Sequence, residues 1–213
     1  YYVATPKAWQ IKIFKILGIR EKSLINSSKY KHIFADKVIS LDHPWYHKGY
    51  FQEQVKKLPR WIIFINRKLF LNKAKKIKSS KKIFLDRSRS KYNHCQIFNQ
   101  KKFNKWIKKK KITSYKPENL SLEKQIYLFN KASIILGAHG AAFTNIIFCR
   151  PGTKIIEIIP EDHPNRKCER ISKILKLKYF RIITKPKNTN KNFPYRIHLE
   201  EKHLKMINKA INL

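Results

Sequence analysis

Residues 133–148 read Ser-Ile-Ile-Leu-Gly-Ala-His-Gly-Ala-Ala-Phe-Thr-Asn-Ile-Ile-Phe and combine three patterns. The first apolar run predicts a buried strand, Gly137 and Gly140 predict a tight turn, and residues 141–148 predict a helix. Such a turn leaves backbone N–H groups without partners at the helix start, where they attract an anion such as phosphate. Alternatively, the glycines only let the strand and the helix pack closely. The stretch therefore predicts either a phosphate site or a packing turn.

Short apolar runs alternate with helical patterns on both sides of this turn. This order predicts an α/β fold with a parallel sheet, and the residues from 83 to 213 hold a whole Rossmann-like domain. We expect a linker at 74–82 and part of a second Rossmann-like domain at 1–73. Because the chain starts at Tyr1, already inside a strand-like pattern, it is expected to be an excerpt or a processed product. The expected strands are 24–26, 37–41, 83–85, 112–115, 133–137, 154–159 and 179–183, and the expected helices are 5–17, 50–71, 99–109, 122–132, 141–148, 166–177 and 196–211.

The composition favours a folded but very basic protein. With 213 residues, 42% of them hydrophobic and 13% aromatic, the chain can bury a core. The net charge is +36, and most of the 49 basic residues are lysines spread along the chain. A solvated surface shaped by codon bias, a polyanion-binding face and attraction to an acidic membrane are all compatible with this charge. Since nucleic-acid readers usually favour arginine, a nucleic-acid partner is not expected.

Several classes of site are disfavoured by the spacing of residues. The three cysteines fit neither a disulfide framework nor a zinc site, which indicates a reducing compartment. His43 and His47 flank a proline, so they are a weak metal pair. No Asp-x-Asp pair exists to clamp Mn²⁺, and the glycines match neither G-x-G-x-x-G nor a P-loop. We therefore expect no metal and no cofactor, and a dinucleotide oxidoreductase is disfavoured.

Three expected loops follow strands of the C-terminal domain, at 86–90, 137–140 and 160–163. Ligands of parallel sheets bind beyond the carboxyl ends of the strands, so these loops should cluster on one edge. The loop at 42–47 could face them from the N-terminal domain. The sequence thus predicts a ligand site at this edge.

Each candidate residue has a binding and a structural interpretation. Arg87 and Ser88 could donate to a diphosphate or belong to an ordinary basic loop. His139 could contact a ligand or hydrogen-bond only the turn backbone. Glu157, inside an apolar strand, could accept from sugar hydroxyls or pair with a lysine or arginine. Asn145 could tie down a neighbouring loop.

Three groups of segments follow one another along the chain: Ile83–Ser90 with Ile97-Phe98-Asn99-Gln100, then Leu120-Ser121-Leu122-Glu123-Lys124-Gln125 with Gly137–Asn145, then Pro151–Glu157. Together they resemble glycosyltransferase family 61. The order and spacing of the family's motifs fit across about residues 83–183. The family usually has an arginine where this chain has His94-Cys95-Gln96, and a glutamate where it has Gln100.

The resemblance implies a GT-B architecture of two Rossmann-like domains, with the incomplete N-terminal one on the acceptor side. It implies an inverting, metal-independent transfer from a nucleotide sugar to a glycan or surface-polysaccharide acceptor, as in capsular polysaccharide biosynthesis. Asp42 and His43 are the candidates for the general base. We expect a cytoplasmic location, with peripheral contact to the inner face of an anionic membrane. The implied donor-binding residues are Arg87, Ser88, Asn99, Gly137, His139, Gly140, Ala141, Asn145 and Glu157.

Two alternatives to a glycosyltransferase remain open. The charge allows a basic domain that binds nucleic acid or another polyanion. Gln100 and the missing arginine allow a degenerate transferase fold that binds without catalysing.

Overall fold

The computed structural model describes residues 1–39, 58–88, 94–161, 163, 166–185 and 195–213. The chain divides into two compact units, Tyr1–Pro44 and Trp45–Leu213, and each is described by itself. Asp42 and His43, and the end of the strand expected at 37–41, lie outside the described residues. Residues 37–39 are described and form no strand.

The first unit is a small β-α-β arrangement. Its two strands are parallel, with Tyr2 opposite Ile25. None of its described residues, 1–39, is buried, and Trp9 on the helix is 59% exposed. These residues therefore form secondary structure of the expected type without a core of their own. The elements are β1 (Tyr2–Val3), α1 (Ala8–Ile16), η1 (Glu21–Ser23) and β2 (Ile25–Asn26).

The second unit is built on a five-stranded sheet in the order β4-β3-β5-β6-β7, with every neighbouring pair parallel. This sheet confirms the predicted α/β class. All five residues of β5 are buried because helices cover both faces of the sheet, which explains its unbroken apolar sequence. The strands are β3 (Lys82–Leu85), β4 (Thr113–Tyr115), β5 (Ile134–Ala138), β6 (Lys154–Pro160) and β7 (Lys178–Thr184).

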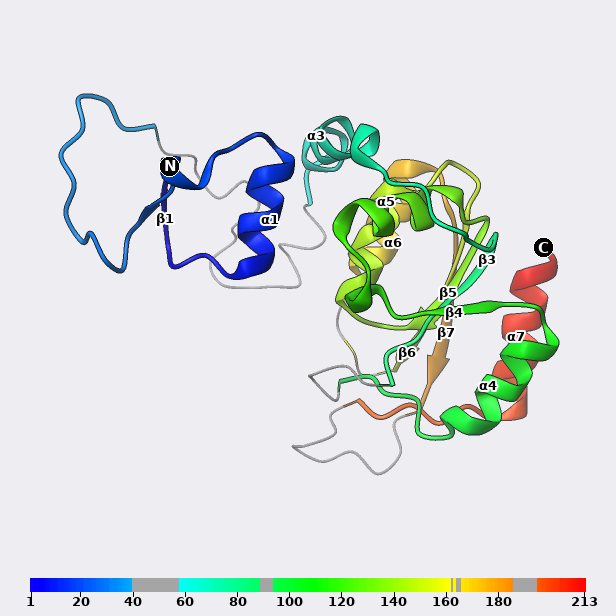
Figure 1. The fold of residues 1–213 in the computed structure, drawn as a ribbon. Coiled ribbons are helices and arrows are strands. Elements are labelled where there is room, and N and C mark those ends of the chain that lie inside the picture. The colour runs from blue at the N-terminus through cyan, green and yellow to red at the C-terminus, as the bar shows by residue number, and fades with distance from the viewer. Residues whose placement is uncertain (40–57, 89–93, 162, 164–165, 186–194) are drawn as a thin grey trace. The chain divides into compact units, whose positions relative to one another are not determined.

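Helices lie on the two sides of the sheet (Figure 1). The helices α4 and α7 close one core, in which the rings of Phe84 and Phe103 meet edge to face at 5.3 Å. The opposite face carries α3, α5, η4 and α6. The helical bounds are α3 (Arg60–Phe70), η2 (Leu71–Lys73), α4 (Gln100–Lys109), η3 (Pro117–Asn119), α5 (Leu122–Lys131), η4 (Ala141–Phe148), α6 (Lys167–Leu175) and α7 (Glu201–Asn212).

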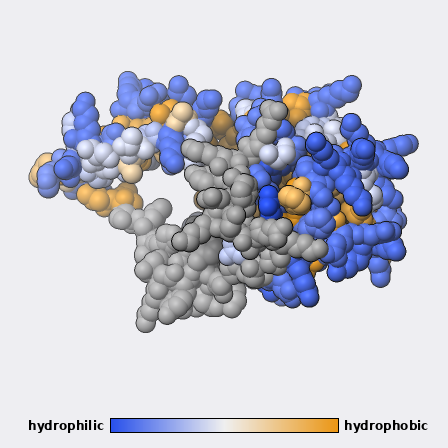
Figure 2. Space-filling model, turned by 90° about the horizontal axis from the view of Figure 1, so that it is seen from below, coloured by the Kyte–Doolittle hydropathy of each residue, from blue (hydrophilic) through white to orange (hydrophobic). Residues whose placement is uncertain are grey.

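Lysines occupy the solvent side of these helices. On α4, Phe103 and Ile107 are buried while the five lysines of the helix are exposed. Seen from below, the described surface is mostly hydrophilic, with scattered hydrophobic patches (Figure 2). The basic charge of α4 is therefore solvated and does not disturb the core. No helix within the described ranges has the length and apolarity needed to cross a membrane.

Three elements differ from the sequence predictions. The segment 141–148 is a 3₁₀ helix, not an α-helix. The helix α3 belongs to the second unit, although the sequence grouped residues 60–70 with an N-terminal domain ending at 73. Its Arg67 donates to the carbonyl oxygens of Ile147 and Cys149 at the C-terminal end of η4, and this contact fixes α3 there. The last helix begins at Glu201, since Ile197 pairs with Ile97 in a β-bridge.

Gly137 in β5 lies close to the neighbouring strand β3 and to η4. A Cβ there would stand 3.0 Å from Leu85 Cβ and 3.2 Å from Phe143 Cε2. Gly137→Ala should therefore lower the free energy of unfolding by about 1–3 kcal/mol, measured by urea denaturation. Ser114→Ala, at an exposed position of β4, is the control and should stay within about 0.5 kcal/mol of wild type. A Gly137→Ala variant as stable as the control would contradict the close approach.

Candidate functional site

The strand order indicates where on the sheet a ligand is expected to bind. The strands β3 and β5 are neighbours although β4, which lies on the other side of β3, comes between them in sequence. At such a switch point the two following segments run to opposite faces and open a crevice beyond the carboxyl ends of the strands. Arg87 follows β3, and the glycine turn follows β5. We call the edge formed by the loops after β3, β5 and β6 the carboxyl rim.

A cavity of about 100 Å³ lies at this switch point. Polar side chains from the β3 loop and from the start of α4 line it, among them Arg87, Ser88 and Gln100. Cys95 and Gln96 close the cavity on another side. It is therefore a small pocket with both cationic and neutral hydrogen-bond donors.

Arg87 lies directly against the glycine turn. Its Nη1 donates to the carbonyl oxygen of His139 at 2.5 Å. A Cβ on Gly140 would fall 1.0 Å from the same Nη1, so only glycine leaves room for the guanidinium. Burial lowers the pKa of Arg87, and the nearby Cys95 and Glu118 oppose this shift. Arg87 thus places a cation over the turn, and phosphate binding there stays a prediction.

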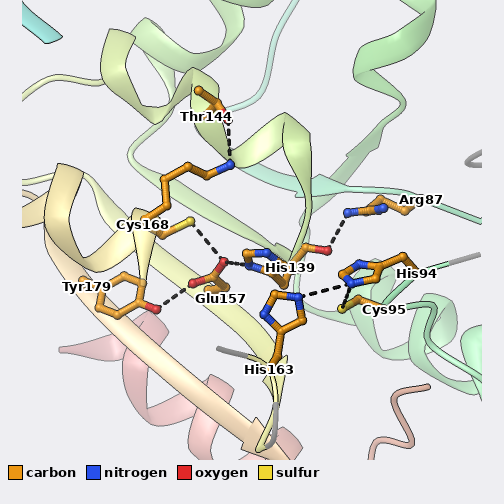
Figure 3. A network of polar contacts seen from close by, with 10 residues as sticks. Arg87, His94, Cys95, His139, Thr144, Glu157, His163, Cys168 and Tyr179 are labelled. Atoms are coloured by element: carbon orange, nitrogen blue, oxygen red, sulfur yellow. Dashed lines mark hydrogen bonds and ion pairs between the residues drawn. The ribbon is translucent and has the colours of Figure 1, made fainter. Parts of the chain in front are cut away.

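Glu157 is the centre of a buried polar network (Figure 3). Its side chain in β6 is 1% exposed and accepts from His139 Nδ1 at 2.6 Å. Cys168 Sγ on α6 donates to the same carboxylate oxygen at 3.0 Å, and the Tyr179 hydroxyl on β7 donates to the other at 2.6 Å. The sequence expected sugar hydroxyls or a basic partner here. The structure instead gives both oxygens donors from within the protein, so Glu157 orients His139.

The pKa values agree with this arrangement. Burial acts to raise the pKa of Glu157, but the hydrogen bond and charge of His139 and the two other donors hold it below its ordinary value. Burial and the adjacent carboxylate raise the pKa of Cys168 and that of Tyr179, so both remain protonated donors. Because Nδ1 of His139 donates to the carboxylate, Nε2 is the nitrogen through which this ring can act on other groups.

Two histidines that the sequence did not single out adjoin His139. His163, in the loop after β6, has its ring centroid 4.2 Å from that of His139. Its Nε2 lies 3.2 Å from Nε2 of His94. Burial lowers the pKa of His94 and lowers that of His163 to about 4, so both rings are neutral at pH 7. The three loops therefore meet on the carboxyl rim as predicted. His163, which contacts His139, belongs to the predicted loop at 160–163.

The remaining candidates have structural partners or lie at the surface. Asn99 exchanges two hydrogen bonds with the backbone of Leu199 and fixes the segment before α7. Asn145 donates to Gln125 Oε1, and Gln125 Nε2 donates to two carbonyl oxygens of the loop before α5. This is the loop-tying role considered for Asn145. Ser88 and Ala141 are exposed at the carboxyl rim, where a ligand can reach them.

The carboxylate of Glu157 should contribute to stability in a pH-dependent way. The pKa of Glu157 is lower in the folded protein than in the unfolded chain. The carboxylate therefore stabilises the fold fully at pH values above the unfolded-state pKa. This stabilisation is lost as the pH falls through the folded-state pKa. We expect Glu157→Gln to cost about 1–3 kcal/mol at pH 7 in urea unfolding. The difference in free energy of unfolding between Glu157→Gln and the wild type should become smaller as pH falls below about 4.

Glu169→Gln is the matched control for Glu157→Gln. Glu169 lies on α6, is exposed and forms a surface ion pair with Arg166 at 3.7 Å. Its substitution should change stability by less than about 0.5 kcal/mol at either pH. If the two variants behave alike, the carboxylate network does not hold the carboxyl rim.

Comparison with known proteins identifies the family. The profile of Glycosyltransferase 61 matches residues 2–156, which extends the predicted resemblance toward the N-terminus. Over 61 residues the chain is 38% identical to a beta-1,2-xylosyltransferase from Arabidopsis thaliana. That segment is 29% of this chain and 11% of the relative, so the chain matches only a small part of that protein. Since the family profile covers well over half of its residues, the chain belongs to glycosyltransferase family 61.

Proposed function

We propose that the carboxyl rim holds the diphosphate of a nucleotide-sugar donor and that the chain contributes to sugar transfer onto a glycan or polysaccharide acceptor. The observation that carries this proposal is the placement of Arg87 over Gly140 at the switch point of the sheet. The family membership supplies the reaction class. A nucleoside-diphosphate pentose is the first donor to test, because the matched relative is named as a xylosyltransferase.

Arg87 would bind the diphosphate and neutralise its charge as the leaving group departs. A guanidinium has a planar set of donors that suits phosphate oxygens. Here one of these donors is engaged by the carbonyl of His139, which fixes the orientation of the group. A pre-positioned cation stabilises developing charge without reorganising during the reaction.

The first turn of η4 would add backbone donors to the same site. The first N–H groups of a helix have no partner within it, and those after Gly140 begin at the exposed Ala141. The small residues 140–142 let a ligand approach the backbone. This arrangement supports a transfer in which the cation and the helix start do the work of a metal clamp.

The acceptor hydroxyl needs a general base in an inverting transfer. Asp42 and His43 stay the candidates from the N-terminal part, outside the described residues. His139, held by Glu157, would position the donor through Nε2. The exposed lysines of α4 would favour contact with an anionic membrane where surface polysaccharides are made, each adding about 1 kcal/mol near the surface.

Arg87→Ala should weaken nucleoside-diphosphate binding by roughly 10- to 100-fold, since hydrogen bonds to a charged group contribute about 1.5–3 kcal/mol. The measurement is calorimetric titration with a nucleoside diphosphate chosen by a thermal-shift screen of diphosphates and their sugars. Arg150→Ala is the control, because Arg150 is exposed in the loop before β6, at the opposite edge of the sheet. Equal affinities for the two variants would reject the site.

Gly140→Ala tests the same contact without removing the charge. Its Cβ would displace the guanidinium, so it should weaken binding in the same direction as Arg87→Ala. In the Arg87→Ala background the additional loss should be small, because the two changes act on one interaction. Fully additive losses, with circular dichroism showing folded variants, would mean that Gly140 serves the ligand independently of Arg87.

A further inference from the structure

We propose that His94, Cys95 and His163 form a binding site for a borderline transition-metal cation, with Zn²⁺ as the expected occupant. The three side chains come from the segment before α4 and from the loop after β6. Their ligand atoms all lie within 4.8 Å of one another (Figure 3). The site goes beyond the proposed sugar transfer and does not depend on it.

The distances are close to those of a tetrahedral site. Bonds of about 2.0–2.1 Å to nitrogen and 2.3 Å to sulfur place two nitrogens about 3.3 Å apart and a nitrogen and a sulfur about 3.6 Å apart. Here the Nε2 atoms of His94 and His163 are 3.2 Å apart, and Sγ of Cys95 is 4.0 Å from His94 Nε2. Only a small side-chain movement is needed to bring all three atoms around one ion. A fourth position would be left for water or another ligand.

The chemical type of the groups also suits a metal. The imidazole nitrogen of histidine and the sulfur of cysteine are both ligands of Zn²⁺, and Cys95 and His163 are buried. Arg87 lines the same cavity as Cys95 and repels a cation, and a cysteine thiolate bound to the ion would offset that repulsion. Nitrogen and sulfur ligands select zinc-like ions over Mg²⁺ or Mn²⁺.

The backbone at this cluster is unusual. Among the described residues, four that are not glycine have positive φ, and Lys111 and Lys176 are at or just after helix ends. The other two are Cys95, at 54°, and Tyr195, at 58°. The Tyr195 ring packs against both His94 and His163, at 5.1 and 4.8 Å. Such conformations are uncommon and cost energy, so their pairing around the two histidines points to a functional constraint.

A second cluster, His139, Glu157 and Cys168, has similar spacing but a different chemistry. Its thiol and its histidine both donate to the carboxylate, and the pKa of Cys168 is raised by burial and by Glu157. A metal there would have to replace these hydrogen bonds. Cys168 therefore provides a sharp control for Cys95.

Cobalt titration under reducing conditions tests the site directly. The metal-free wild-type protein should bind one Co²⁺ with a thiolate-to-cobalt charge-transfer band, and Zn²⁺ should abolish the band by competition. Cys95→Ser should remove the charge-transfer band. His163→Gln should weaken Co²⁺ binding and alter the visible bands of the bound ion.

Cys168→Ser and Cys149→Ser should leave the band unchanged, with circular dichroism confirming that each variant is folded. Cys149 is buried, its pKa is raised by burial, and it lies at the end of η4. Absence of the band in the wild type would overturn the proposal. So would a band that survives Cys95→Ser, or one that only Cys168→Ser removes.

Discussion

The buried carboxylate of Glu157 is the constraint on which the carboxyl rim depends. Taking an ionised carboxylate out of water costs several kcal/mol unless donors surround it. Here the donors come from the turn after β5, from α6 and from β7. Satisfying one charge therefore fixes three separate elements relative to β6. The orientation of His139 follows from this requirement.

Arg87 connects this buried network to the switch point between β3 and β5. Its hydrogen bond to the His139 carbonyl joins the loop after β3 to the turn that Glu157 already holds. The absence of a side chain at Gly140 is what lets the guanidinium lie there. At the other end of η4, Arg67 bonds two carbonyl oxygens. The short 3₁₀ helix is thus bound by an arginine at each end, which favours a fixed geometry for its exposed first turn.

The sequence predicted what depends on local pattern. The apolar runs at 133–137 and 154–159 predicted buried strands, which the structure has at Ile134–Ala138 and Lys154–Pro160. Glu157 stood out because it interrupts one of them. The hydrogen-bond partners of Glu157, such as Tyr179, were not predictable. They lie on other elements, and the sequence around them shows no pattern typical of such a contact. The 3₁₀ form of 141–148 and the packing of α3 depend on tertiary contacts such as those of Arg67. His94 and His163 meet across 69 residues of sequence, beyond the reach of ligand-spacing patterns.

The two sites that we propose at the carboxyl rim differ in the softness of their groups. Arg87 and the helix start present hard donors to phosphate oxygens, whereas His94, Cys95 and His163 offer nitrogen and sulfur. A zinc-like ion bound by His94, Cys95 and His163 would not replace a magnesium or manganese clamp. These three residues include none of the carboxylate ligands that magnesium and manganese ions require. It would tie the segment at Cys95, which borders the cavity beneath Arg87, to the loop that packs on His139. The metal would then act on the proposed nucleotide-sugar site by holding its two sides together.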